Sequence, residues 1–183
     1  MTLPAEYSWL SKEPGPKILI EALKLFGTKE TAGDKDNPEI LDWATELGIQ
    51  NYQHDSIAWC GLFMAVVAHR AGKTVVKEPL WARNWLKFGA SCEPELGAVL
   101  TFWRDDKPGD KKYSHVGIYA AEDAEAFYVI GGNQQDSVRV SRILKERLLG
   151  ARAEYKTAKP ANVRKVIISR PATDFPAVSV NEK

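Results

Sequence analysis

The sequence predicts an α+β domain, with helices in the first half of the chain and antiparallel strands in the second. Before residue 90, apolar residues recur at every third or fourth position, which is the spacing of helices with one buried face. After Gly97, short apolar runs alternate with clusters of turn-forming residues, which is the pattern of strands joined by hairpins. Helices followed by a run of hairpin-linked strands are typical of the α+β class.

The first elements along the chain are predicted to be an irregular lead-in and two helices. The lead-in covers residues 1–15, and a helix follows over 16–26, where the apolar residues share one face. Asn37 is a good N-cap for a second helix over 38–47, because its side chain can accept a hydrogen bond from a backbone N–H of the first turn.

The segment 55–72 predicts the helix around which the chain is organised. Asp55 or Ser56 can cap its start, Gly72 can end it, and its apolar residues recur at helical spacing. Cys60 falls near the first turn, where the helix dipole and the unpaired N–H groups favour a thiolate. A lone cysteine on an apolar face is more often a small core residue, so a catalytic role depends on residues elsewhere in the chain.

A short helix with an aromatic face is expected over 80–88. Aromatic residues at this spacing usually belong to the core, and the lining of a groove by Trp81 or Trp85 is the alternative. A charged loop at 104–112 separates the first two strands, and the residues beyond Pro171 have the composition of a loose end. The strands are expected at 98–103, 114–120, 126–130, 137–143 and, as a fifth, 163–169.

Composition indicates one ordinary globular domain. The chain is 44% hydrophobic and 27% charged, and we find no repeat or linker, so a single domain over 1–183 is expected, with a core at about 16–170 and irregular ends at 1–15 and 171–183. A formal net charge of +1 argues against nucleic acid as a partner. The N-terminus shows no long apolar run or signal peptide, so we expect synthesis in the cytoplasm without stable membrane insertion.

No metal, other cofactor or disulfide is expected. Cys60, Cys92 and the three histidines do not fall into a metal-binding pattern, and the core is large enough to need no disulfide. Asp34 and Asp36 lack the glycine and the distal glutamate of a calcium loop, so turn and capping roles explain them better.

A cysteine nucleophile needs a base, and three histidines compete for that role. His69 lies on the predicted cysteine helix, roughly 13 Å from Cys60 at 1.5 Å per residue, which is too far. His54 lies in a polar loop with nothing to hold it. His115 is the strongest candidate because it stands in a strand, between Ser114 and a small glycine.

The base needs a third group to orient its ring. Asn133 follows the strand 126–130 at a Gly-Gly pair, where glycine permits close backbone approach, and its side-chain carbonyl can accept the imidazole N–H. Gln134, Gln135 and Asp136 are the alternatives, and a turn role for Asn133 is also open.

Three segments together resemble the signatures of the NlpC-like and CHAP cysteine amidohydrolases and peptidases. They are residues 59–63 (Trp-Cys-Gly-Leu-Phe), 114–119 (Ser-His-Val-Gly-Ile-Tyr) and 130–134 (Ile-Gly-Gly-Asn-Gln). The likeness runs from about residue 33 to 152 and is closest to a subgroup of small, often phage-encoded proteins.

The resemblance implies a papain-like fold, with N-terminal helices packed on a C-terminal antiparallel sheet. Carried over by position, Cys60 is the nucleophile, His115 the base and later the acid, and Asn133 the group that orients His115. Many CHAP members have a glutamate where this chain has two glycines, so a neighbour of Asn133 stays open as the third residue. Candidate substrate-binding residues are Trp59, Trp103, Tyr113 and Gln134.

The resemblance also implies hydrolysis of an amide bond in bacterial peptidoglycan through a thioester intermediate. The bond is either that between the muramoyl lactyl group and L-alanine or a peptide bond of the stem or cross-link. The expected role is that of a phage endolysin, a monomeric catalytic domain that is made in the host cytoplasm and acts on the cell wall. A secreted antibacterial toxin and a non-catalytic wall-binding or virion-associated protein are the alternatives.

Overall fold

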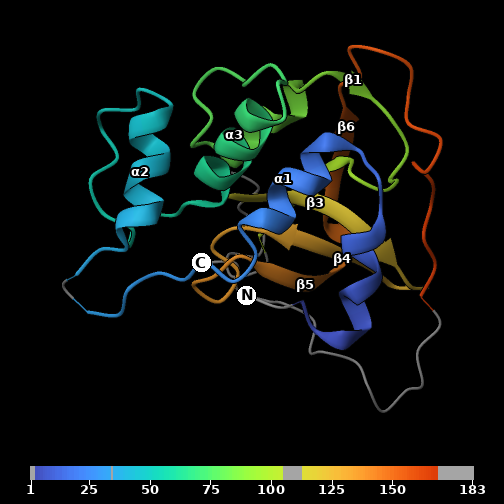
Figure 1. Ribbon diagram of the computed structural model, residues 1–183, viewed down its shortest axis with the longest axis horizontal. Coiled ribbons are helices and arrows are strands. Elements are labelled where there is room, and N and C mark those ends of the chain that lie inside the picture. The colour runs from blue at the N-terminus through green and yellow to red at the C-terminus, as the bar shows by residue number, and fades with distance from the viewer. Residues whose placement is uncertain (1–2, 34, 105–112, 169–183) are drawn as a thin grey trace.

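Six antiparallel strands form one sheet in the order β1-β6-β2-β3-β4-β5 (Figure 1). The structure is a computed structural model, and it describes residues 3–33, 35–104 and 113–168. The strands are β1 (Ala90–Ser91), β2 (Val99–Trp103), β3 (Ser114–Glu122), β4 (Ala126–Gly131), β5 (Arg139–Leu144) and β6 (Leu148–Ala153). The predicted α+β class is confirmed.

Three α-helices precede the sheet in the chain. They are α1 (Lys17–Lys24), α2 (Pro38–Glu46) and α3 (Cys60–Arg70), with 3₁₀ helices η1 (Ala5–Lys12), η2 (Ala82–Lys87) and η3 (Lys145–Arg147). The N-cap prediction for Asn37 is confirmed, since its side chain accepts a hydrogen bond of 2.9 Å from the backbone N–H of Glu39. Within the described ranges, no helix combines the length and the apolar character needed to cross a bilayer.

The start of α3 corrects two expectations. The N-cap is Trp59, which makes no side-chain capping bond, whereas Asp55 is buried and accepts hydrogen bonds from the backbone N–H groups of Thr31 (2.9 Å) and Asn37 (2.7 Å). Asp55 therefore ties down the loop before α2 instead of capping α3. The helix is also not amphipathic, because every residue from Cys60 to Ala68 is buried, as in a helix surrounded by protein.

Two further expectations on secondary structure are wrong. The lead-in is not irregular, since η1 buries Tyr7 and Leu10 in the core. The segment 163–169 is not a strand as far as it is described, and it contributes one parallel bridge to β3, between Ile167 and Glu122. The strand in its place is β6, which pairs with both β1 and β2. The tail beyond Pro171 and most of the charged loop, at 105–112, lie outside the described residues.

The central helix α3 packs against α1 and α2 and also against β3 and β4, and Figure 1 shows it between α2 and the strands. The sheet carries a second apolar cluster, which includes Leu100, Phe102, Phe127, Val129 and Ile143. Strands β3 and β4 are therefore buried along almost their whole length. A strand with both faces buried can hold a polar side chain in a fixed orientation, away from water.

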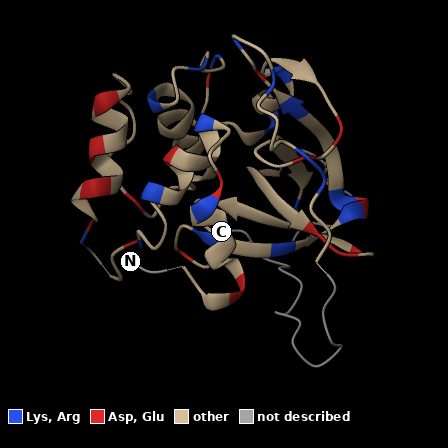
Figure 2. Ribbon diagram, turned by 45° about the vertical axis from the view of Figure 1, so that its right-hand side comes forward, with Lys and Arg blue, Asp and Glu red and all other residues tan. Residues whose placement is uncertain are grey.

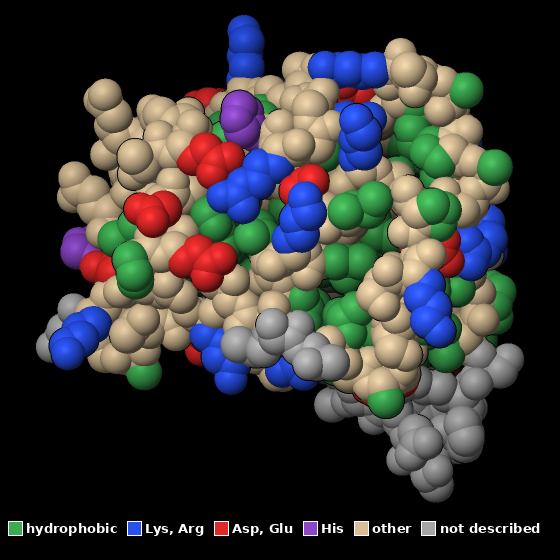
Figure 3. Space-filling model, viewed as in Figure 1, with side chains coloured by type: hydrophobic (Ala, Val, Ile, Leu, Met, Phe, Trp, Pro, Cys, Tyr) green, Lys and Arg blue, Asp and Glu red, His purple; other side chains and the backbone are tan. Residues whose placement is uncertain are grey.

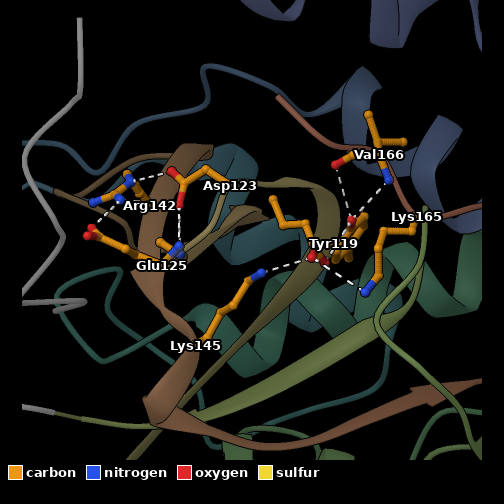
Figure 4. A network of polar contacts seen from close by, with 9 residues as sticks. Tyr119, Asp123, Glu125, Arg142, Lys145, Lys165 and Val166 are labelled. Carbon is orange, nitrogen blue, oxygen red and sulfur yellow. Dashed lines mark hydrogen bonds and ion pairs between the residues drawn. The ribbon is translucent and has the colours of Figure 1, made fainter. Parts of the chain in front are cut away.

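The turn between β3 and β4 is secured by buried charges (Figure 4). Asp123 accepts a hydrogen bond of 2.8 Å from Nε of Arg142 and one of 2.9 Å from the hydroxyl of Tyr128. Burial alone would raise the pKa of Asp123, but these bonds and two from backbone N–H groups outweigh burial and hold the pKa well below its usual range. Beside it, Glu122 accepts from Lys145 (2.8 Å) and from the hydroxyl of Tyr119 (3.1 Å).

Surface charge is mixed. Figure 2 shows acidic positions along α2 and basic positions scattered over other elements. On the face drawn in Figure 3, lysine and arginine side chains lie among aspartate and glutamate side chains. This face accordingly presents no continuous patch of one sign, in line with the formal net charge of +1.

Candidate active site

Cys60 is the first residue of α3, and the helix start places it in the wall of a cleft. The cleft has a volume of about 410 Å³ and is also lined by Trp81, Arg83, Arg104 and Tyr113. Cys60 is 6% exposed, so a small part of its surface reaches the cleft. A thiol at a helix N-terminus stands among backbone N–H groups that have no partner within the helix, which is a favourable place for an anion.

Gly61 allows the first turn of α3 to pack closely against the loop before η2. A Cβ at this position would lie 2.3 Å from the carbonyl oxygen of Pro79 and 2.6 Å from that of Leu80. Both neighbours are backbone atoms, so a larger residue would push the helix start, and Cys60 with it, away from its place.

His115 lies in β3, opposite Phe102 of β2, and is fully buried. Its Nε2 is 3.0 Å from Oε1 of Gln134, which is also fully buried. Because α3 packs directly on β3, the cysteine and the histidine come from two elements in contact. The other histidines lie elsewhere, His54 at 3.2 Å from a carboxylate oxygen of Asp36 and His69 exposed in the last turn of α3.

The hydrogen bonds of Gln134 determine which nitrogen of His115 carries the proton. The amide Nε2 of Gln134 donates to the carbonyl oxygens of Val129 (3.1 Å) and Arg139 (2.6 Å), so both amide hydrogens are used. Oε1 can then only accept, and the neutral His115 ring must donate to it from Nε2–H. In this tautomer Nδ1 holds the lone pair, which is the form needed in a general base.

Two glycines allow the end of β4 to lie close to His115 and Gln134 and to the start of α3. A Cβ on Gly131 would lie 2.9 Å from Oε1 of Gln134 and 3.1 Å from Nε2 of His115. A Cβ on Gly132 would lie 2.5 Å from Cβ of Phe63 and 2.8 Å from the ring of Trp59, which are three residues and one residue from Cys60 in the chain. The close backbone approach expected at this Gly-Gly pair is therefore confirmed.

The loop after β4 is held in an unusual conformation. Asn133, Gln135 and Asp136 have φ angles of +55°, +50° and +56°, in the left-handed region that non-glycine residues adopt only when their surroundings impose it. Gln134 stands between them with its side chain turned inward to His115. The backbone N–H of Gln134 also donates to the carbonyl of Ser137 (3.0 Å), which closes the loop.

The structure separates the roles predicted for Asn133 and Gln134. The side chain that hydrogen-bonds His115 is that of Gln134, an alternative for the orienting group that was also a candidate for substrate binding. Asn133 is buried and lines a neighbouring cavity of about 350 Å³ together with Glu30 and Asp136. The cause is the loop backbone, which turns successive side chains in different directions.

The remaining substrate-binding candidates differ in position. Trp59 is fully buried, packs edge-on against Trp43 at 5.9 Å between ring centroids, and is part of the core. Trp103 ends β2 and donates from its indole N–H to the carbonyl of Glu146 (3.4 Å). Tyr113 is 38% exposed and lines the cleft beside Cys60, so it is placed to contact a substrate.

Three charged residues of the cavities were not singled out from the sequence. Arg83 and Arg104 line the Cys60 cleft, and Arg104 lines the neighbouring cavity as well. Glu30 accepts a hydrogen bond of 3.2 Å from the indole N–H of Trp59, yet burial raises the pKa of its carboxyl group. Sequence carried no signal for them, because Glu30 and Arg104 lie in segments without regular periodicity, and Arg83 is not one of the apolar positions from which the helix over 80–88 was predicted. In the described part of the chain, no group of three or more histidine, cysteine or acidic side chains could hold a metal ion.

No protein-family model matches the chain, and no curated protein does. A solved structure that resembles it is that of a Staphylococcus aureus subsp. aureus Mu50 protein described as similar to a lipoprotein of the NLP/P60 family. The TM-score is 0.44 at 18% sequence identity, and the match covers 92% of this chain and 44% of that one. This chain thus spans less than half the length of that protein, and the likeness is too distant to assign a family.

Proposed function

We propose that the chain hydrolyses an amide bond of bacterial peptidoglycan, with Cys60 as the nucleophile and His115 as its base. The observation that carries the proposal is the fixed amide of Gln134, which leaves Nδ1 of the neutral His115 ring to accept a proton. Gln134 is a positioning residue, because it acts through His115. The substrate class is taken from the resemblance of the three sequence motifs.

The reaction proceeds in two halves. Cys60 Sγ gives its proton to His115 and attacks the amide carbonyl carbon, and the backbone N–H of Cys60 is one donor for the resulting oxyanion. The C–N bond then breaks, and the nitrogen leaves as an amine with the proton from the imidazolium of His115. A water molecule, deprotonated by His115, attacks the thioester and releases the carboxylic acid and the thiol.

The biological role that we propose is that of a phage endolysin, which degrades the wall of the host cell at the end of infection. The motif resemblance to small phage-encoded hydrolases supports this role. A secreted antibacterial toxin would use the same chemistry on the same substrate. A wall-binding protein of the same fold would need neither the oriented histidine nor the cysteine.

The test is mass spectrometry of soluble fragments released from purified Gram-negative peptidoglycan. We expect fragments from the wild type and from Cys92→Ser, the control for loss of a thiol, and none from Cys60→Ser. Equal release by Cys60→Ser would refute the thiol mechanism. Sedimentation with insoluble peptidoglycan without any release would favour the binding protein.

A further inference from the structure

The cleft that holds Cys60 is the middle of three connected hollows. On one side it shares Leu80 and Trp81 with a hollow of about 450 Å³. On the other side it shares Ala58 and Arg104 with the cavity of about 350 Å³ that Asn133 lines. Because neighbouring hollows share lining residues, we treat the three as one groove with Cys60 in its middle hollow, a shape suited to an elongated substrate.

The hollow beyond Trp81 is lined mostly by uncharged residues, whereas Arg83 lines the Cys60 cleft itself. Trp81 is 61% exposed although its side chain is large and apolar, and it lines both the Cys60 cleft and the hollow next to it. The outer hollow is further lined by residues 48–51, which offer backbone and side-chain amides, and it has one carboxylate, that of Glu78. A broad apolar ring face beside amide donors and acceptors is suited to a sugar ring, which has apolar C–H faces and polar hydroxyl edges.

The opposite side of the groove is charged. Its lining includes the carboxylates of Glu30 and Asp136 together with the guanidinium of Arg104. Groups of both signs in one cavity suit a peptide that itself carries both an ammonium and a carboxylate group, because each substrate charge finds an opposite partner. An uncharged sugar would gain nothing from these groups and would have to displace their water.

Proton transfer decides which half of the substrate lies on which side. His115 protonates the leaving nitrogen, so the leaving amine must lie on the side of His115 and Gln134. The loop that carries Gln134 continues into the wall of the charged hollow through Asn133 and Asp136. The acyl half then extends the other way, toward Trp81.

We propose that the Trp81 side of the groove binds the sugar and the charged side binds the peptide of one substrate. The bond at Cys60 is then the amide between the lactyl carboxyl group of the sugar and the N-terminal nitrogen of the peptide. The thioester forms between Cys60 Sγ and the lactyl carbonyl carbon, the peptide leaves as an amine protonated by His115, and water releases the lactyl carboxylate. This inference rests on the proposed function and selects one bond among those it allows.

The first test labels the amino groups that digestion creates. Purified peptidoglycan is digested with wild-type enzyme, treated with fluorodinitrobenzene and hydrolysed, and the labelled amino acid is identified. We expect new label on the first residue of the stem peptide, together with sugar chains that carry free lactyl carboxylates. New label on a residue within the stem or cross-link would overturn this inference and leave the proposed function standing. No new label and no fragments would overturn both.

The second test removes the aromatic platform. Trp81→Ala is expected to lower kcat/KM on peptidoglycan about tenfold, mainly through KM, because contact with the sugar is lost. Ile167→Ala is the matched control, since Ile167 is also 61% exposed and lies in the segment that bridges to β3; it should leave kcat/KM unchanged. Equal effects of the two variants would refute a sugar site at Trp81.

The third test concerns the charged side. Glu30→Gln keeps an acceptor for the indole N–H of Trp59 but removes the negative charge. We expect it to reduce the rate on intact peptidoglycan more than the rate on peptidoglycan whose free amines have been acetylated. The same reduction on both substrates would show that Glu30 does not bind a substrate ammonium group, and would overturn the assignment of this side.

Discussion

Replacing Gln134 by methionine removes the amide that fixes His115 and keeps a side chain of similar length. The wild-type amide accepts one hydrogen bond from His115 (3.0 Å) and donates two to backbone carbonyls (3.1 and 2.6 Å), all of them around a fully buried side chain. Methionine can form none of these bonds at comparable strength. The imidazole is then free to adopt the other tautomer, in which Nδ1 carries the hydrogen and cannot act as the base.

The expected loss can be worked out for stability and for activity separately. At about 1 kcal/mol net for each hydrogen bond, the three bonds contribute roughly 3 kcal/mol to the free energy of unfolding. For a domain of this size that corresponds to a fall in Tm of about 6–12 °C. Loss of the orienting carboxylate in a serine-protease triad lowers kcat about 10⁴-fold. Because Gln134 carries no charge to stabilise the imidazolium, we expect a smaller loss here, on the order of 10²- to 10³-fold.

The assay measures kcat and KM for fragment release across a range of pH, beside a thermal unfolding curve of each variant. Gln135→Met is the matched control, because it makes the same chemical change at the next residue of the loop, where the side chain is exposed. The loss in Gln134→Met should fall on kcat, with a changed pH profile, while the control retains both. If Gln134→Met folds and keeps its kcat and pH profile, the tautomer argument is refuted.

Three further predictions concern the helix start, the buried ion pair and the second thiol. Gly61→Ala should lower the free energy of unfolding by about 3 kcal/mol, measured by urea unfolding, because the added methyl group meets two backbone carbonyl oxygens. Asp123→Asn should cost about 3 kcal/mol at pH 7, since it leaves the buried guanidinium of Arg142 without its main partner. The pKa of Asp123 is lowered in the folded state. Its contribution to the free energy of unfolding is therefore present above the ordinary carboxyl pKa of about 4 and is lost as the pH falls below that value. In acid, the free energy of unfolding of Asp123→Asn should accordingly fall less steeply than that of the wild type. In Cys60→Ser, alkylation of Cys92 should rise about tenfold per pH unit up to about pH 11, because burial, with a smaller contribution from Glu95, raises the pKa of the Cys92 thiol to about 11.

Each of these predictions has a result that would contradict it. Gly72→Ala lies in open space and changes only a residue with φ of +67°, so a cost as large as that of Gly61→Ala would show that close contact is not the cause. For the ion pair, an acid unfolding curve that is equally steep in Asp123→Asn and wild type would contradict the linkage. For the thiol, rapid alkylation of Cys92 at neutral pH would show that its environment does not disfavour the thiolate.

Local sequence signals predicted the elements that depend on neighbouring residues. Asn37 caps α2 as expected because a capping bond spans only two residues. The strands β2 to β5 were predicted from apolar runs that the buried sheet requires. β6 was missed, because its sequence, Leu-Leu-Gly-Ala-Arg-Ala, lacks β-branched and aromatic residues and is held in the sheet by pairing on both sides.

The sequence by itself determined the class of the fold, the helix that carries Cys60, and the strand that carries His115. Only the tertiary structure decided that the side chain of Gln134 hydrogen-bonds His115, and that Trp59 is core while Trp81 lines the groove. The physical reason is the range of the interactions. Caps and periodicity act between residues close in the chain, whereas the bond from His115 to Gln134 joins residues 19 positions apart and depends on loop dihedral angles that no local pattern specifies.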